Sequence, residues 1–227
     1  MSQQQAAVQN GIDDAMTLPG YEFPTRRLKN VLSDSGRTPL VLVACGSFSP
    51  ITYLHLRIFE MALDWVRYNT EFEVIEPLHK EYLPTAKVLD HFDHELNEVR
   101  GGVEDRSGQK RKVRVALLAG DLWAPKDLDH ILGHYGAFIV EREGTDIDDA
   151  LASLQQWRDN IYVIHQLVKN DVSSTRIRLF LKRDMSIRYL VPEPVIKYIE
   201  ANGLYSEEAD KDRKEEKGKE AQASSSS

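Results

Sequence analysis

Cysteine is nearly absent from this chain, which has one, Cys45, among 227 residues. A single cysteine excludes an internal disulfide framework of the kind that stabilises small secreted domains. Long apolar runs are also missing. No stretch of about 18 apolar residues occurs, and the first residues lack a basic segment followed by an apolar one. The sequence therefore indicates neither a membrane span nor secretion, and we expect no membrane partner.

An excess of positive charge is missing too. The chain has 29 Lys and Arg residues against 36 Asp and Glu residues, which gives a formal net charge of −7. General nucleic-acid surfaces are basic, so we expect no nucleic-acid partner. Any phosphate ligand would then be bound by local groups and not by an overall positive field.

The two ends of the chain differ in composition from the middle. Residues 1–37 open with a Gln-rich stretch and continue with scattered Pro, Gly and charge, whereas residues 206–227 mix acids and lysines before four serines. Such composition is typical of disordered segments. We therefore predict a disordered tail over 1–37, one folded domain over 38–205 and a second tail over 206–227. The 41% hydrophobic content is enough for one sizeable core.

Apolar runs alternate with helical patterns between these tails. The predicted strands are residues 40–45, 72–76, 113–119, 137–141 and 161–165. The predicted helices are residues 54–68, 80–98, 126–134, 147–157, 174–182 and 194–202. This alternation predicts an α/β fold with a doubly wound parallel sheet, in which ligands bind at the carboxyl ends of the strands.

The first chemical motif follows the strand predicted over 40–45 and reads GSFSPITYLH from Gly46 to His55. Gly46 allows a ligand to approach the backbone, and the helix start that follows offers unpaired N–H groups and a positive dipole end to a phosphate. His55 lies about one turn into that helix and can reach the same phosphate. A lone histidine more often faces solvent or the core, but after this strand, turn and helix start the ligand interpretation is favoured.

The second motif follows the strand predicted over 161–165 and reads NDVSSTRIR from Asn170 to Arg178. Ser173 or Ser174 caps the helix that begins there, which is the usual role of serine at such a position. Two arginines in the first turn oppose the positive end of the helix dipole unless an anion is present. Arginine also donates hydrogen bonds in a fork that matches phosphate oxygens. The motif therefore predicts a triphosphate site.

Together, in this order and each after a strand, the two motifs resemble the GxFxPxHxGH and SSTxxR signatures of the nucleotidyltransferase superfamily. Thr52 stands where other branches carry the first histidine, and the later segments SIRYLVP (186–192), YIE (198–200) and NGLY (202–205) are similar to one eukaryotic branch. That branch is the nicotinamide/nicotinate mononucleotide adenylyltransferase family. The resemblance covers roughly residues 40–205 and implies a Rossmann-like nucleotidyltransferase fold.

The resemblance is interrupted at two places. After Pro77 the chain passes directly to a helical segment, where family members first have a lysine-rich loop, a helix and a third strand. After Gly120 a flexible loop before a Leu-Trp pair is shortened, so Asp121 stands either for the substrate-binding Asp of the family or only for the residue before that pair. The resemblance therefore implies a sheet that lacks one crossover unit, and the sequence leaves the activity of the shortened chain open.

The reaction that the resemblance implies is adenylyl transfer. The 5′-phosphate of the mononucleotide attacks the α-phosphorus of ATP, which gives NAD or deamido-NAD and pyrophosphate. Catalysis of this kind needs alignment and neutralisation of phosphate charge, with Mg²⁺ that accompanies ATP and without a protein nucleophile. His55 and Arg178 are the implied catalytic residues.

The implied binding residues form two groups. The ATP-binding group is Gly46, Ser47, Phe48, His55, Asn170, Ser174, Thr175, Arg176, Ile177 and Arg178. The mononucleotide-binding group is Gly120, Asp121, Leu122 and Trp123. Trp123 serves there either as a platform for the pyridine ring or as ordinary packing. No protein metal site is predicted, because His91 and His94 lack carboxylate or cysteine partners and their spacing is typical of an exposed helix face.

Three functions remain open at this point. The first is the pyridine mononucleotide adenylyltransferase; the second is a catalytically weak version that binds a nucleotide or a partner. The third is an adenylyl- or cytidylyltransferase for another phosphorylated substrate, against which Thr52 and the C-terminal segments argue. The basic residues 110–112 with Arg114 are either a nuclear-import patch or a solvated turn. We expect a location in the nucleus, the cytoplasm or both, and the oligomeric state stays open, with a homo-oligomer as one alternative.

Overall fold

The computed structural model describes residues 22–23, 25–75, 85–120, 127–141 and 151–205. The chain divides into two units, which are described separately. Unit 1 comprises residues 1–46 and 58–169, and unit 2 comprises residues 47–57 and 170–227. The predicted tail over 206–227 and most of the one over 1–37 lie outside the described residues.

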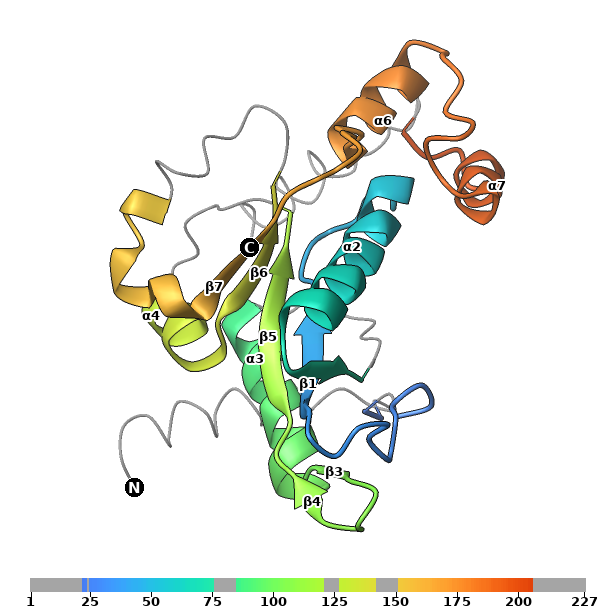
Figure 1. The fold of residues 1–227 in the computed structure, drawn as a ribbon. Coiled ribbons are helices and arrows are strands. Elements are labelled where there is room, and N and C mark those ends of the chain that lie inside the picture. Colours follow the sequence, from blue (N-terminus) through green and yellow to red (C-terminus); the bar gives the residue numbers. More distant parts are fainter. Residues whose placement is uncertain (1–21, 24, 76–84, 121–126, 142–150, 206–227) are drawn as a thin grey trace, which may run out of the picture. The chain divides into compact units, whose positions relative to one another are not determined.

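A five-stranded parallel sheet forms the centre of unit 1 (Figure 1). Its strands are β1 (Thr38–Val43), β2 (Phe72–Val74), β5 (Arg114–Ala119), β6 (Ala137–Val140) and β7 (Ile161–Ile164). The order is β2-β1-β5-β6-β7, and every neighbouring pair is parallel. The chain moves outward from β1 to β2 and then crosses to the other side of β1, so the topological switch point lies between β1 and β5. The predicted doubly wound α/β fold is confirmed.

Helices cover both faces of this sheet (Figure 1). On one face lies α2 (Tyr53–Asn69), where the Trp65 ring meets the edge of Phe138 from β6 with 5.9 Å between centroids. On the other face lies α3 (Thr85–Asp93), whose Phe92 is 1% exposed and belongs to the main hydrophobic core. Burial on both faces explains why the strands read as continuous apolar runs in the sequence.

Two of the predicted α-helices end in π-helical turns. Helix α3 passes into η1 (His94–Val99), and α4 (Leu128–His130) passes into η2 (Ile131–Tyr135). Leu96 and Leu132 within these turns remain buried, so the hydrogen-bond period of the helix changes without loss of core contacts. The prediction of uninterrupted α-helices over 80–98 and 126–134 was therefore wrong at their C-terminal ends.

A buried carboxylate joins α3 to η2. Asp90, 8% exposed, accepts hydrogen bonds at Oδ1 from the Tyr135 hydroxyl and from His130 Nε2, both at 2.6 Å. Burial, followed by the hydrogen bond to Asp90, raises the pKa of Tyr135. The phenol therefore stays protonated and keeps donating to the carboxylate.

Two further elements differ from the prediction. The 3₁₀ helix η3 (Gln155–Asn160) takes the place of the end of the α-helix predicted over 147–157, of which residues 147–150 lie outside the described residues. A hairpin of β3 (Val103–Glu104) and β4 (Lys110–Arg111), which was not predicted, includes two of the basic residues 110–112. Its basic residues are partly neutralised, because Lys110 lies 3.4 Å from Glu104 and Arg111 lies 3.9 Å from Asp105.

The segment before β1 is more ordered than the prediction of a tail up to residue 37 allowed. Leu28 is 7% exposed and Leu32 is 1% exposed, and both belong to the core of unit 1. Leu32 N–H also donates to the Glu104 carbonyl at 2.8 Å. Two leucines four positions apart form too short a pattern to predict a helix or strand. Their burial depends on tertiary packing.

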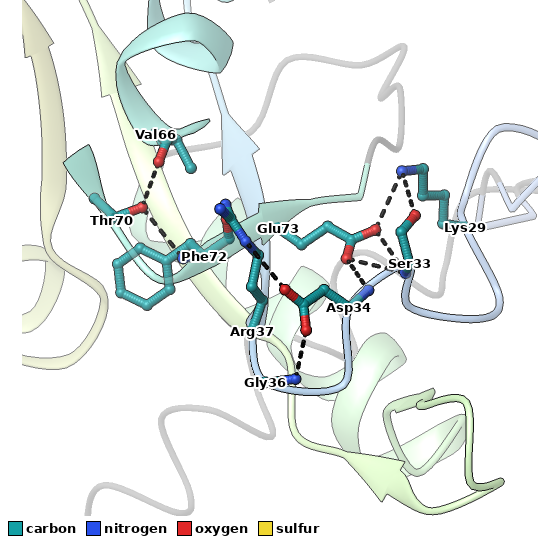
Figure 2. Close-up of polar contacts among 9 residues, drawn as sticks. All are labelled: Lys29, Ser33, Asp34, Gly36, Arg37, Val66, Thr70, Phe72 and Glu73. Carbon is teal, nitrogen blue, oxygen red and sulfur yellow. Dashed lines mark hydrogen bonds and ion pairs between the residues drawn. The ribbon is translucent and has the colours of Figure 1, made fainter. Parts of the chain in front are cut away.

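Glu73 of the edge strand β2 anchors that segment (Figure 2). Its two carboxylate oxygens accept from Ser33 N–H, each at 3.0 Å, and Oε2 accepts from Asp34 N–H at 3.2 Å. Lys29 Nζ lies 3.2 Å from Oε1, and the Glu73 side chain is 10% exposed. Partial burial by itself raises the pKa of Glu73, but the hydrogen bonds from Ser33, Lys29 and Asp34 outweigh it and lower the pKa below the ordinary 4.5.

We expect Glu73→Gln to lower the free energy of unfolding at neutral pH by about 1–2 kcal/mol, because an amide replaces a charged acceptor of several hydrogen bonds. A lowered pKa in the folded state stabilises the protein above the unfolded value near 4.5, and this stabilisation is lost as the pH falls through the folded pKa. The unfolding free energies of the variant and the parent, measured by urea titration, should therefore converge below that value. The control is Glu71→Gln, the same change at an exposed position two residues earlier. Equal losses for the two variants, or a difference that does not depend on pH, would contradict the anchor role.

Unit 2 is helical in its described part. It contains α6 (Ser174–Lys182), which begins and ends where predicted, and α7 (Glu193–Ala201). Its core consists of Ile177, Ile187, Val191, Ile196 and Ile199. Throughout the described ranges of the chain, no helix has both the length and the apolar character that a membrane crossing requires.

Candidate functional site

Unit 2 brings together residues of the two predicted motifs. The Ser174 hydroxyl donates to the Pro50 carbonyl at 2.9 Å, and Arg178 Nη1 donates to the Ser49 carbonyl at 2.5 Å. These partners are 124 and 129 positions apart in the sequence. The turn of the first motif is therefore held directly by the first turns of α6.

The start of α6 assigns separate roles to the two serines. Ser173 is the N-cap, since its side chain accepts from Arg176 N–H at 3.3 Å. Ser174 instead binds the Pro50 carbonyl. The alternative that this motif is only a helix cap accounts for Ser173 and leaves Ser174 and Arg178 unexplained.

Arg178 is fixed from two sides. Besides the Ser49 carbonyl it donates through Nη2 to Thr175 Oγ1, one turn earlier on α6, at 3.2 Å. A guanidinium has five N–H donors in a rigid fork, so these two contacts orient it and leave donors for an oxyanion. The structure thus holds both Thr175 and Arg178 at the same end of α6.

The other two predicted residues of α6 lie differently. Arg176 forms an ion pair with Asp171, and the two side chains are 58% and 47% exposed. Such an exposed pair contributes little to stability, so the arginine can exchange its carboxylate for a phosphate at small cost. The Ile177 side chain is 0% exposed in the core of unit 2. Its N–H donates to the Ser173 carbonyl, so Ile177 contributes to the scaffold of the helix.

His55 and Thr52 form a reciprocal pair at the start of α2. Thr52 N–H donates to His55 Nδ1 at 2.9 Å, and His55 N–H donates to Thr52 Oγ1 at 3.4 Å. This is the geometry of a capping box, with histidine where glutamate or glutamine is usual. Sequence reasoning missed this role of Thr52, although the T-x-x-H spacing, which matches that of a capping box, carried the signal.

Phe48 approaches His55 from the turn. Its ring stands edge-on to the imidazole with 5.1 Å between centroids. The Phe48 φ angle is 43°, in the left-handed region that bulky residues rarely occupy. Such conformations persist where surrounding contacts impose them, and here Ser49 Oγ lies 2.6 Å from the Tyr205 hydroxyl. Ser47 begins this same turn.

Asn170 shapes the approach to α6. Its Oδ1 accepts from Val172 N–H at 3.0 Å, which forms an Asx turn just before the Ser173 cap. The Asn170 side chain therefore orders its own loop. Its contact with adenosine stays a prediction.

The remaining predicted residues belong to unit 1 or lie outside the described part. Gly46 and Gly120 follow the ends of β1 and β5, two paired parallel strands. They therefore lie at the carboxyl edge beside the topological switch point, where ligands bind in this kind of sheet. Asp121, Leu122 and Trp123 lie outside the described residues.

Metal ligation finds no support in the described ranges, in which no group of three or more His, Cys, Asp or Glu side chains is placed to hold an ion. The interpretation of His91 and His94 as an exposed helix face was wrong for His91. That residue is 1% exposed and packs against the ring of Phe23 with 5.7 Å between centroids.

Comparison with known proteins gives several relatives, although no family model matches the chain. The nicotinamide/nicotinic acid mononucleotide adenylyltransferase 1 of Saccharomyces cerevisiae is 43% identical over 254 positions, which cover 88% of this chain and 63% of the relative. The Schizosaccharomyces pombe adenylyltransferase of the same name is 43% identical over 84% of this chain and 67% of the relative. The Bos taurus adenylyltransferase 1 is 30% identical over 79% of this chain and 93% of the relative.

The lengths of these alignments are informative. The budding-yeast alignment runs over 254 positions, more than the 227 residues of this chain, so it contains positions with no counterpart here. The chain spans 63% of the length of that relative. A solved structure of the Plasmodium falciparum nicotinic acid mononucleotide adenylyltransferase complexed with NaAD gives a TM-score of 0.48 at 17% identity, over 74% of this chain and 98% of that one. This similarity is too distant to bear on the site.

Proposed function

This chain belongs to the nicotinamide/nicotinic acid mononucleotide adenylyltransferase family, and we propose that it transfers AMP from ATP to the 5′-phosphate of nicotinamide or nicotinic acid mononucleotide. The products are NAD or deamido-NAD and pyrophosphate. The observation that carries this proposal is the attachment of Arg178 and Ser174 to the carbonyls of Ser49 and Pro50. It joins the histidine-bearing turn and the arginine-bearing helix start, each of which supplies donors for phosphate.

In the proposed reaction a mononucleotide phosphate oxygen bonds to the α-phosphorus of ATP while the bond from that phosphorus to the β-phosphate oxygen breaks. His55 donates a hydrogen bond to the α-phosphate, and Thr175 and Arg178 hold the β- and γ-phosphates that leave as pyrophosphate. The N–H groups at the start of α6 add a positive dipole end at the same place. These fixed donors neutralise the charge that moves onto the leaving group, and this is the main contribution of the protein in phosphoryl transfer.

Mg²⁺ enters this proposal as part of the MgATP substrate complex. It would neutralise charge on the phosphates, with phosphate oxygens and water as its ligands. The chain's own contribution is the set of hydroxyl, guanidinium and N–H donors around those phosphates.

A catalytically weak nucleotide-binding protein is the second candidate function. The observation that favours it is the number of alignment positions without a counterpart in this chain. A transferase for another phosphorylated substrate is less favoured, because the relatives are named for pyridine mononucleotides.

The test is product formation by the purified chain with ATP, Mg²⁺ and each mononucleotide in turn, followed by chromatography of the dinucleotide and by pyrophosphate release. Calorimetric titration with MgATP measures nucleotide binding separately. We expect equal amounts of dinucleotide and pyrophosphate, and neither when the mononucleotide is omitted. Binding of MgATP without any product would overturn the enzymatic proposal and support the weak binder.

A further inference from the structure

We propose that Thr52 is a positioning residue that sets the tautomer of His55, so that Nε2 carries the imidazole proton. The inference rests on the proposed function in one respect: the Nε2 proton is donated to a phosphate oxygen of the substrate. The tautomer itself follows from hydrogen-bond geometry at the start of α2.

The direction of one hydrogen bond decides the tautomer. A backbone N–H can only donate, and Thr52 N–H lies 2.9 Å from His55 Nδ1. Nδ1 must therefore accept. A neutral imidazole has one accepting and one donating nitrogen, so the proton lies on Nε2.

The Thr52 hydroxyl completes the pair. Oγ1 accepts from His55 N–H at 3.4 Å and lies 3.0 Å from the same Nδ1. The backbone N–H and the hydroxyl of Thr52 therefore both lie within hydrogen-bond distance of Nδ1. Thr52 contacts the ring of His55 and also its backbone N–H. Because Thr52 is 0% exposed, water has no access through which to replace these contacts.

The consequence concerns an anionic ligand. Oxygens of a fully ionised phosphate only accept hydrogen bonds, so a ring nitrogen with a proton attracts them and one with a lone pair repels them. Fixing the tautomer before the ligand arrives removes the need to reorganise the imidazole in the transition state. Thr52 stands at a position where other branches of the superfamily have histidine. Its proposed role is to orient the His55 ring and not to contact the phosphate itself.

The tautomer can be read directly. Protein labelled with ¹⁵N-histidine gives two-bond ¹H–¹⁵N correlations in which the protonated and unprotonated ring nitrogens differ in shift, and His55→Asn identifies the His55 signals by their loss. For the full chain at neutral pH we expect a protonated Nε2 and an unprotonated Nδ1. A protonated Nδ1 would overturn the inference.

Three variants separate the hydroxyl from general effects on the helix. Thr52→Val keeps the shape and the backbone N–H but removes the hydroxyl, so we expect Nε2 to stay protonated, the Nδ1 resonance to shift because one of the two groups beside it is lost, and kcat to fall about tenfold, with a smaller change in KM for ATP. Thr52→Ser should restore the parent Nδ1 shift and most of kcat. The matched control is Thr70→Val at the other end of α2, where the hydroxyl donates to the Val66 carbonyl, and it should leave the His55 signals and kcat unchanged.

The two readouts fail independently. Wild-type signals and kcat in Thr52→Val would overturn the positioning role even if the enzyme is active. If the parent chain makes no dinucleotide, the proposed function fails, whereas the ¹⁵N shifts of the parent still decide the tautomer, and those of Thr52→Val decide whether the hydroxyl acts on Nδ1.

Discussion

Arg178→Ala should lower kcat/KM for dinucleotide formation by about 100- to 1,000-fold, the usual effect of removing one fixed donor to transition-state charge. The structure gives the reason, because Arg178 is oriented by the Ser49 carbonyl and by Thr175 Oγ1 before any ligand binds. The measurement is initial rate against ATP concentration at saturating mononucleotide. The kcat/KM of Arg178→Lys should lie between those of the parent and of Arg178→Ala, since lysine keeps the charge and loses the planar fork.

The control for this experiment is Arg183→Ala, which removes an exposed arginine just after the C-terminal end of α6. It should retain nearly full activity. Because Arg178 also holds the turn, thermal unfolding of each variant must accompany the kinetics. A folded Arg178→Ala variant with the activity of the parent would show that Arg178 does not act on the phosphates.

Phe138→Ala should lower the free energy of unfolding by about 3–5 kcal/mol, as is typical when a large buried aromatic side chain is truncated. Phe138 is 0% exposed on β6 and stacks on Tyr162 of β7, with 4.6 Å between centroids and 16° between ring planes. Truncation leaves a cavity and removes both this stacking and the contact with Trp65 of α2. Urea titration monitored by circular dichroism measures the change.

A partner experiment uses Phe59→Ala on α2, where the ring is 36% exposed. The same atoms are removed, but less buried surface is lost, so the decrease should be well under half of that for Phe138→Ala. Phe138→Leu, which keeps most of the volume, should also cost less. Similar losses at positions 59 and 138 would contradict the expectation that the buried, stacked Phe138 contributes more to stability than the more exposed Phe59.

The sheet could be predicted from the sequence because its strands are buried on both faces. All five predicted strands exist, with ends that differ by no more than two residues. The π turns could not be predicted, since η1 and η2 continue an apolar pattern that also suits an α-helix and differ only in hydrogen-bond period. Leu28 and Leu32 were missed for a related reason: their burial depends on contacts distant in sequence.

The candidate site was predictable to a similar degree. The motifs identified segments that meet in unit 2, where Ser174 binds the Pro50 carbonyl and Arg178 binds the Ser49 carbonyl. They did not reveal that Arg176 is paired with Asp171 or that Thr52 binds the imidazole of His55, because hydrogen-bond partners depend on side-chain geometry. Residue type and spacing predict which groups assemble, and only coordinates show which atoms they use.

The bonds from Ser174 and Arg178 to the turn of residues 49–50 also bear on when the protein becomes able to function. Each closes a loop of more than 120 residues, 124 in one case and 129 in the other. Contacts at such separation are costly in chain entropy and form late in folding. On the ribosome, the turn emerges long before α6 does, and β1 to β7 leave the exit tunnel before Arg178. A growing chain can thus possess its sheet before the proposed triphosphate site exists, because that site forms only when α6 has emerged and folds back onto the turn.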